Sequence, residues 1–136
     1  MLEHYNAFEK NSANHVPLSP LTFIARTANV FPDRVGVIHG DRRFTWSQVF
    51  GRCRQLASGL QNLGIGLGDT VAIMAFNTPE MVECHYGVAA SGAVMNTINT
   101  RLDPDTIAYI LSHGEAQALI TDTAFSETVA AALAIL

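Results

Sequence analysis

The chain has 136 residues, 49% of them hydrophobic, which suits one ordinary globular domain. Its formal net charge is only −4 and it carries no basic stripe, so nothing suggests a nucleic-acid partner. The polar N-terminus has no apolar signal core, and the apolar runs are too short to span a membrane. We therefore predict a cytoplasmic protein.

The beginning of the chain predicts a loose leader followed by a helix. Residues 1–16 are polar and form the expected leader. Ser19 and Pro20 then mark a helix start, because serine is a favoured N-cap and proline fits the first helical position. We expect this helix to end at Pro32.

A hairpin and a long helix come next. Residues 35–39 have β character, Gly40 and Asp41 supply a tight turn, and residues 43–45 return. Thr45 and Gln48 form a capping box that opens a helix to about residue 62. The apolar residues of this helix recur at steps of four and three, so the face that we expect to be buried comprises Val49, Cys53, Leu56, Leu60 and Leu63.

The stretch LGIGLGDTVAIM, residues 63–74, raises the possibility of a phosphate-binding loop. Such a loop follows a strand and opens a helix, whereas these glycines follow a helix and precede an apolar strand. The spacing is also G-x-G-x-G rather than G-x-G-x-x-G. We therefore favour a turn, in which Gly64 ends the helix in a left-handed conformation and Gly66 and Gly68 lead into the strand.

From residue 70 the pattern alternates between strands and helices. We expect strands over residues 70–76, 93–98 and 117–121. The helices between and after them have the predicted N-caps Thr78, Asp103 and either Asp122 or Thr123. The inward face expected for the first of these helices comprises Met81, Val82, His85, Val88 and Ala89, with Gly92 as its end.

This order predicts an α/β fold with a mostly parallel sheet and flanking helices, preceded by a helix and a β-hairpin. Three parallel strands make a small sheet, and the sequence stops in an apolar helix with no closing strand. We therefore expect residues 17–136 to be an incomplete N-terminal part of a larger domain.

Ligands of open parallel sheets bind beyond the carboxyl ends of the strands. The polar residues expected there are Asn77, Thr78, Asn99, Thr100, Arg101, Asp122 and Thr123. We favour capping over catalysis for Thr78, Asp103 and Asp122, because helix starts need acceptors for their free N–H groups. For Asn96 and Asn99 we favour a role in fixing the loop over a role in a site.

The remaining reactive side chains also favour structural roles. Cys84 and His85 are neighbours on a helix and do not face each other, so a catalytic dyad is not expected. Cys53 and Cys84 form no C-x-x-C motif and are expected to be reduced, buried thiols. The five histidines have no metal-ligand spacing, and His113 is placed in a last helical turn. Asp103 and Asp105 lie together at a helix start, where they oppose the dipole.

A series of short segments follows in order along about residues 17–125. It comprises FPDRV (31–35), VIHGDRRFTW (37–46), GIG (64–66), GDTVAI (68–73), NTPEMVE (77–83), GAVMNTINTRL (92–102), HGEA (113–116) and LITD (119–122). This ordered series resembles the opening of AMP-forming acyl-CoA ligases, the adenylate-forming AMP-binding superfamily, and looks closest to its fatty or medium-chain branch.

The resemblance implies a ligase that uses ATP, Mg²⁺ and CoA. A carboxylic acid attacks the α-phosphorus of ATP to give an acyl-adenylate and pyrophosphate, and the CoA thiol then displaces AMP. The family's phosphate loop with its lysine, its Thr-Glu element, its ribose-binding Asp and its C-terminal Lys have no counterpart here, and the only lysine is Lys10.

We therefore predict no catalytic, cofactor-binding or metal-binding residue and no cofactor for these 136 residues alone. Two hypotheses follow. Either the chain is an N-terminal fragment of an acyl-CoA ligase in fatty acid metabolism, inactive alone and partnered by the rest of its chain, or it is a self-contained α/β binding module without catalysis.

Overall fold

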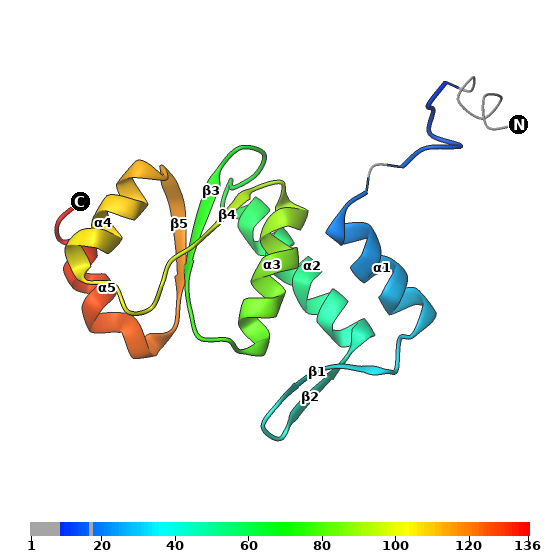
Figure 1. The fold of residues 1–136 in the computed structure, drawn as a ribbon, viewed down its shortest axis with the longest axis horizontal. Coiled ribbons are helices and arrows are strands. Elements are labelled where there is room, and N and C mark those ends of the chain that lie inside the picture. The colour runs from blue at the N-terminus through cyan, green and yellow to red at the C-terminus, as the bar shows by residue number, and fades with distance from the viewer. Residues whose placement is uncertain (1–8, 17) are drawn as a thin grey trace, which may run out of the picture.

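The computed structural model describes residues 9–16 and 18–136, so half of the predicted leader lies outside the described residues. Residues 9–16 contain a turn but no helix or strand. Figure 1 shows the elements that follow: α1 (Pro20–Val30), β1 (Val35–His39), β2 (Arg42–Thr45), α2 (Trp46–Asn62), β3 (Thr70–Met74), α3 (Pro79–Ser91), β4 (Val94–Thr97), α4 (Pro104–His113), β5 (Ala116–Thr121), η2 (Thr123–Phe125) and α5 (Ser126–Leu133).

The sheet of β3, β4 and β5 is parallel, as predicted. β3 lies in the centre, so that the order is β4-β3-β5 and Ile73 pairs with Thr97 on one side and with Ile120 on the other. Residues 71–74 are completely buried because both faces of β3 are covered. The unbroken apolar run in β3 therefore has the cause expected from the sequence.

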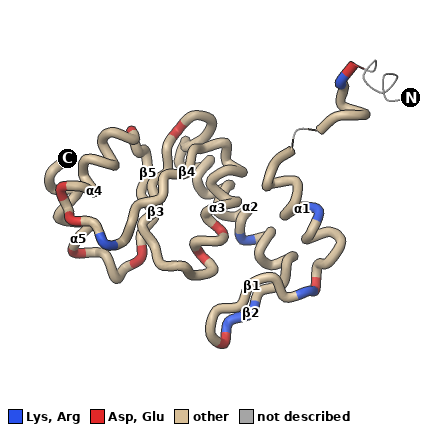
Figure 2. Tube along the Cα trace, viewed as in Figure 1, with Lys and Arg blue, Asp and Glu red and all other residues tan. Residues whose placement is uncertain are grey.

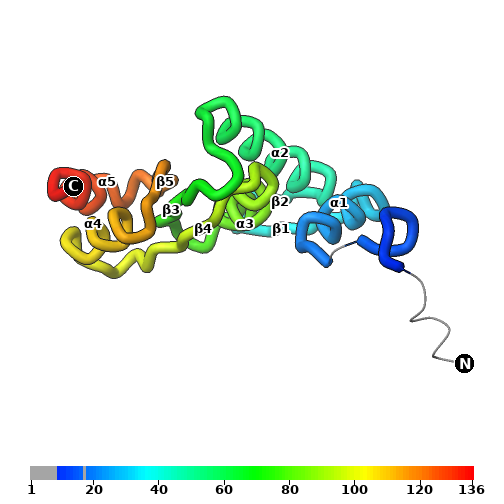
Figure 3. The backbone as a smooth tube through the Cα atoms, turned by 90° about the horizontal axis from the view of Figure 1, so that it is seen from above, coloured from blue at the N-terminus to red at the C-terminus, as the bar shows by residue number. Residues whose placement is uncertain are grey.

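Helices cover the two faces of this sheet in separate layers (Figures 1 and 3). On one face, Ala72 and Met74 pack with Ile107 and Leu111 of α4 and Val129 of α5. On the other face, Val71 and Ile73 pack with residues of α2 and α3, among them Leu60, Cys84 and Val88. The layer of α2 and α3 therefore lies between the sheet on one side and α1 with the hairpin on the other (Figure 1).

The N-terminal elements also form as predicted. The Ser19 hydroxyl accepts from the N–H of Leu21 at 3.2 Å, and α1 ends at Val30, just before Pro32. β1 and β2 form an antiparallel hairpin. The capping box of α2 is present, because Gln48 N–H donates to the Thr45 hydroxyl and Thr45 N–H donates to the Gln48 side chain.

The three glycines before β3 form the predicted turn. Gly64 and Gly68 have φ values of 80° and 89°, in the left-handed region that glycine adopts without a steric cost. The N–H of Gly66 donates to the Asp69 carboxylate at 2.8 Å. Because an internal carboxylate already occupies this N–H, the turn offers it to no phosphate.

The predicted inward face of α3 is wrong in part. His85 and Ala89 are exposed, whereas the buried residues of the helix are Pro79, Cys84, Gly87, Val88 and Ser91. The reason is close packing on α2: a Cβ placed on Gly87 would lie 2.7 Å from the Leu56 side chain. Gly87 therefore faces α2, and the helix is turned so that Cys84 and Val88 are buried beside it in place of His85 and Ala89.

Two further expectations need correction. Leu63 is 76% exposed, because α2 ends at Asn62 and the chain turns there, and Ala57 takes its place in the buried face. Thr78 occupies the N-cap position of α3, but its side chain makes no capping hydrogen bond. None of the helices in the described part of the chain combines the length and the apolar character needed to cross a membrane.

Charge is distributed unevenly along the fold (Figure 2). Seven of the eight lysines and arginines precede residue 55, and eight of the twelve aspartates and glutamates follow residue 62. The basic part holds α1, the hairpin and α2, and the acidic part holds the parallel sheet with its helices. Opposite charges therefore face each other where α3 meets α2 and the hairpin.

Candidate functional site

The carboxyl ends of the three parallel strands meet at one edge of the sheet. Thr121 Oγ1 donates to the carbonyl oxygen of Met74 at 3.0 Å, and the N–H of Asp122 donates to the same oxygen at 3.2 Å. On the other side, the N–H of Ile98 donates to the Ile73 carbonyl at 2.8 Å. The predicted edge residues 77–78, 99–101 and 122–123 are therefore brought to the same edge.

The polar side chains at this edge have local partners. Asn99 Oδ1 accepts from the N–H of Arg101 at 3.0 Å, which fixes the loop after β4 as predicted. Asp122 Oδ1 accepts from the N–H of Ala124 at 2.9 Å and caps η2. Asn96 lies on β4 beside Gly114, in the strand rather than in the loop. Turn formation and capping account for Asn99 and Asp122 without a ligand.

Asp103 caps α4, as predicted. Its carboxylate accepts from the N–H of Thr106 at 3.0 Å and from the Thr106 hydroxyl at 2.9 Å. These hydrogen bonds to the ionised form lower the pKa of Asp103. Asp105 lies in the first turn of the same helix, where its negative charge opposes the positive end of the helix dipole, and His113 lies in the last turn.

A pocket of about 340 Å³ opens beside this edge, between β1 and the start of α3. Its walls include residues 37–39 of the hairpin and residues 77–79, Met81 and His85. His85 Nδ1 lies 2.7 Å from the carbonyl oxygen of Met81. Because a carbonyl only accepts, this bond places the proton on Nδ1 and leaves Nε2 of the neutral ring as an acceptor.

This pocket is the feature that the sequence analysis missed. It joins His39 and His85, which are far apart in the sequence and come together only because the hairpin folds beneath α3. No spacing rule could have paired them. In the described part of the chain, no group of three or more His, Cys, Asp or Glu side chains could hold a metal ion.

Two ion pairs involve the glutamates of α3. Arg42 of β2 pairs with Glu80, and Arg52 of α2 pairs with Glu83, where Arg52 Nη2 and Glu83 Oε2 are 3.1 Å apart. The hydrogen bond from Arg42 lowers the pKa of Glu80 to about 2. The hydrogen bond to Glu83 raises the pKa of Arg52. Both pairs join the basic N-terminal part to α3.

The cysteines are buried thiols without a disulfide, as predicted. Burial raises the pKa of Cys53 and that of Cys84 to about 11 each. Because the thiolate is the reactive form, both thiols are poor nucleophiles at neutral pH. Cys84 is buried while His85 is exposed, so the two do not form a thiol–imidazole dyad.

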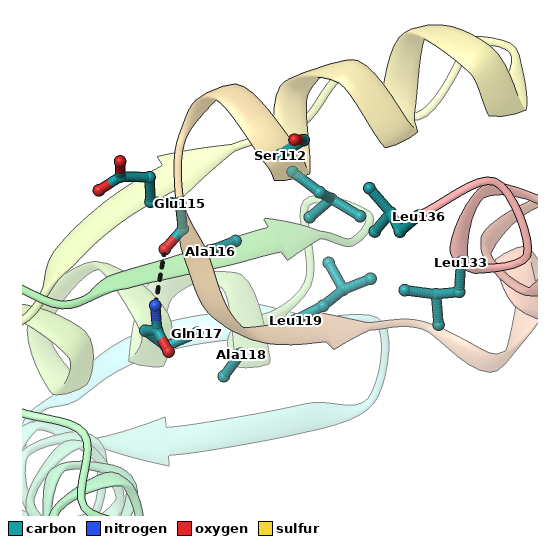
Figure 4. Close-up of a pocket in the computed structure, with 9 residues that line it drawn as sticks. Ser112, Glu115, Ala116, Gln117, Ala118, Leu119, Leu133 and Leu136 are labelled. Carbon is teal, nitrogen blue, oxygen red and sulfur yellow. Dashed lines mark hydrogen bonds between the residues drawn. The ribbon is translucent and has the colours of Figure 1, made fainter.

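A second pocket, of about 350 Å³, lies where β5, α4 and α5 meet. Figure 4 shows Leu119, Leu133 and Leu136 pointing toward one another across it, with Gln117 Nε2 donating to the Glu115 carbonyl at 3.2 Å at the rim. Its lining is mostly apolar, with leucine side chains at its centre. The pocket is therefore a packing surface rather than a reaction centre.

The residues present do not fit ATP and Mg²⁺. Arg101 is the one basic residue after residue 54, and Lys10 lies in the stretch before α1. The Asp122 carboxylate at the sheet edge is committed to capping η2. A triphosphate needs several converging cationic or N–H donors. We therefore derive no catalytic step from these 136 residues.

Comparison with known proteins identifies relatives of this chain. The family model described as AMP-binding enzyme matches residues 24–135. An acetate–CoA ligase of Humulus lupulus is 49% identical over 127 residues, which are 93% of this chain and 22% of that protein. A peroxisomal acetate/butyrate–CoA ligase of Arabidopsis thaliana is 48% identical over 116 residues, covering 85% of this chain and 20% of that protein.

Solved structures agree. The anthranilate CoA ligase AuaEII, in complex with anthranoyl-AMP, superposes with a TM-score of 0.83 at 25% identity, covering 93% of this chain and 24% of that one. The chain thus spans about a fifth of the length of the curated relatives named above. The family match covers most of the chain, so this protein belongs to the AMP-binding enzyme family.

Proposed function

We propose that this chain forms the opening α/β part of an AMP-forming acyl-CoA ligase and is inactive by itself. In the intact enzyme a carboxylic acid, ATP and CoA give an acyl-CoA thioester through an acyl-adenylate, with Mg²⁺ as the counter-ion of the phosphates. The observation that carries this proposal is the family match over residues 24–135, of a chain that spans about a fifth of the length of its curated relatives.

The proposed role of this part is to support the site. The parallel sheet is rigid because β3 is buried on both faces. At its edge, the side chains of Asn99 and Asp122 form hydrogen bonds within a loop and a helix cap. Such an edge holds neighbouring segments in place without performing chemistry. The partner of this surface is then the remainder of the ligase chain.

The relatives guide the proposed substrate class and compartment. Their names point to small carboxylic acids, acetate and butyrate, so we propose a short acyl group within fatty acid metabolism. We propose the cytoplasm as the compartment, although the Arabidopsis thaliana relative is described as peroxisomal. Imaging of a fluorescent fusion that leaves both termini accessible tests this: punctate peroxisomal signal would contradict it.

The experiment has two arms. The 136-residue chain is assayed for ATP–pyrophosphate exchange with acetate, butyrate and benzoate, and we expect none above a blank. The chain then replaces the matching 127 residues of the Humulus lupulus acetate–CoA ligase, and the chimera is assayed for acetyl-CoA formation. We expect activity within about tenfold of the parent, because about half of the exchanged residues are identical and cores tolerate apolar substitutions that keep volume and pattern.

Either arm can overturn the proposal. Exchange by the chain alone would contradict its inactivity. A chimera that unfolds cooperatively, like the parent, but makes no acetyl-CoA would contradict the supporting role. A rise in the unfolding midpoint of the chain alone on addition of a carboxylate or nucleotide would instead favour a self-contained binding module.

A further inference from the structure

The far end of the β1–β2 hairpin stands away from the body of the protein (Figure 1). Residues 38–43, which contain the turn, are all exposed. Toward its base, Val37 and Phe44 pack against the cluster of Ile24, Val49 and Cys53. The hairpin therefore has an anchored base and an end that projects over the start of α3.

The ion pair between Arg42 and Glu80 attaches this end to α3. The two side chains are 47% and 46% exposed. The guanidinium carbon of Arg42 also lies 5.2 Å from the centre of the Phe44 ring, with the guanidinium carbon of Arg52 5.5 Å from the same centre. A pair this exposed contributes little net stability and is weakened by salt.

The base of the hairpin is held much more firmly. The N–H of Trp46 donates to the Arg34 carbonyl at 3.0 Å, and the N–H of Ser47 donates to the Pro32 carbonyl at 3.1 Å. The Trp46 ring lies directly against Gly36, where a Cβ would come within 2.6 Å of it. The strand register is irregular between Val35 and Val37, a feature that bends a two-stranded ribbon at that point.

The pocket described above lies between this hairpin and α3. Residues 37–39 form its hairpin wall, and residues 77–79 with Met81 and His85 form the opposite wall. The position of the hairpin end therefore sets the width of the pocket. The exposed end of the hairpin lacks the core contacts of its base, and the ion pair to Glu80 is the contact that holds this end against α3.

We propose that residues 38–43 form a flap over this pocket, which moves beyond the anchored residues Val37 and Phe44 and has its latch in the Arg42–Glu80 ion pair. When the pair is formed, the hairpin wall is held against the start of α3. When the pair separates, the exposed end of the hairpin moves away from α3 and the pocket opens, while the base of the hairpin and the sheet of β3, β4 and β5 do not move. Higher ionic strength favours the open form.

Amide hydrogen exchange of the 136-residue chain, read by NMR or mass spectrometry, tests the flap. We expect Glu80→Gln and Arg42→Gln each to increase exchange severalfold at residues 38–43 without changing β3 and β5. High salt should produce the same pattern in the unmodified chain. Arg43→Gln is the matched control, because this exposed neighbour makes no ion pair within the described part of the structure.

Two additional readouts make the test decisive. The charge-swapped double variant, Arg42→Glu with Glu80→Arg, should return hairpin exchange toward that of the unmodified chain. The fluorescence of Trp46, the only tryptophan, should be unchanged in Glu80→Gln, because the base stays fixed. Unchanged exchange in both single variants, equal acceleration throughout β3 and β5, or a shifted Trp46 emission would overturn the proposal.

Discussion

The region before residue 63 and the region after residue 69 hold their strands by different means. β1 and β2 pair only with each other, and the end of their hairpin is exposed. β3 has a parallel neighbour on each side and helices on both faces, so residues 71–74 are inaccessible to solvent. Local contacts and charges therefore hold the end of the hairpin, whereas burial holds the parallel strands.

The comparison shows where the two regions depend on each other. α3 packs on α2 through Gly87 and Leu56, and its Glu80 and Glu83 bind arginines of the first region. The acidic helix thus serves as a joint for the basic N-terminal part. Stability should then fall most for changes in β3, less for changes at the joint, and least for changes on the hairpin.

The largest effect is expected for Ile73→Ala in β3. Ile73 is fully buried, and removing its side chain leaves a cavity, so we expect a loss of about 2–5 kcal/mol in the free energy of unfolding. Urea unfolding followed by circular dichroism measures it. Leu67→Ala is the control, since Leu67 is 94% exposed and should change stability by less than about 0.5 kcal/mol. Equal losses of unfolding free energy in the two variants would refute the prediction that burial in β3 determines stability.

A smaller effect is expected at the joint. Gly87→Ala would place a methyl group 2.7 Å from Leu56 and force α2 and α3 apart, at a cost of about 1–3 kcal/mol. Adding Leu56→Ala should cost less than the sum of the two single changes, because it makes room for the methyl group. Gly51→Ala, in open space on α2, should instead stabilise the chain. Strict additivity would contradict the proposed contact.

The N-caps of α2 and α3 are both threonines, but they differ in hydrogen bonding. The Thr45 hydroxyl caps α2, so Thr45→Ala should cost about 1 kcal/mol. Thr78 makes no such bond to α3, so Thr78→Ala should cost clearly less. Thermal unfolding of the two variants under identical conditions provides the measurement. A larger loss at Thr78 would mean that its hydroxyl does cap the helix.

The smallest effect concerns the Arg42–Glu80 pair. The pKa of Glu80 is about 2 in the folded chain, below its ordinary value of 4.5, so its carboxylate stabilises the fold above pH 4.5. That contribution is lost as the pH falls toward 2. We expect Glu80→Gln to lower stability by at most about 1 kcal/mol near neutral pH, with the difference vanishing toward pH 2. Melting curves of both proteins between pH 7 and pH 2 would reveal it, and a difference that grows with acid would contradict the sign.

Much of the fold could be predicted because it depends on local patterns. Ser19, Asp103 and the Thr45–Gln48 box begin helices by bonding to nearby backbone, and Gly64 and Gly92 end them through positive φ. The apolar run of β3 predicted burial on both faces. The predictions that Asn99 fixes its loop and that Cys53 and Cys84 are buried, free thiols are confirmed. They could be made because turn formation and burial depend on the chemistry of the residues themselves.

The order and type of the elements, the parallel sheet and the family resemblance could all be predicted from sequence patterns. Three features depend instead on long-range packing: the buried face of α3, the pairing of Arg42 and Arg52 with Glu80 and Glu83, and the position of His39 and His85 in one pocket. Local hydrogen bonding and periodicity act between residues a few positions apart. Contacts between residues tens of positions apart depend on how closely two backbones approach. A glycine such as Gly87 permits a close approach, but its presence in the sequence does not show which helix it will contact.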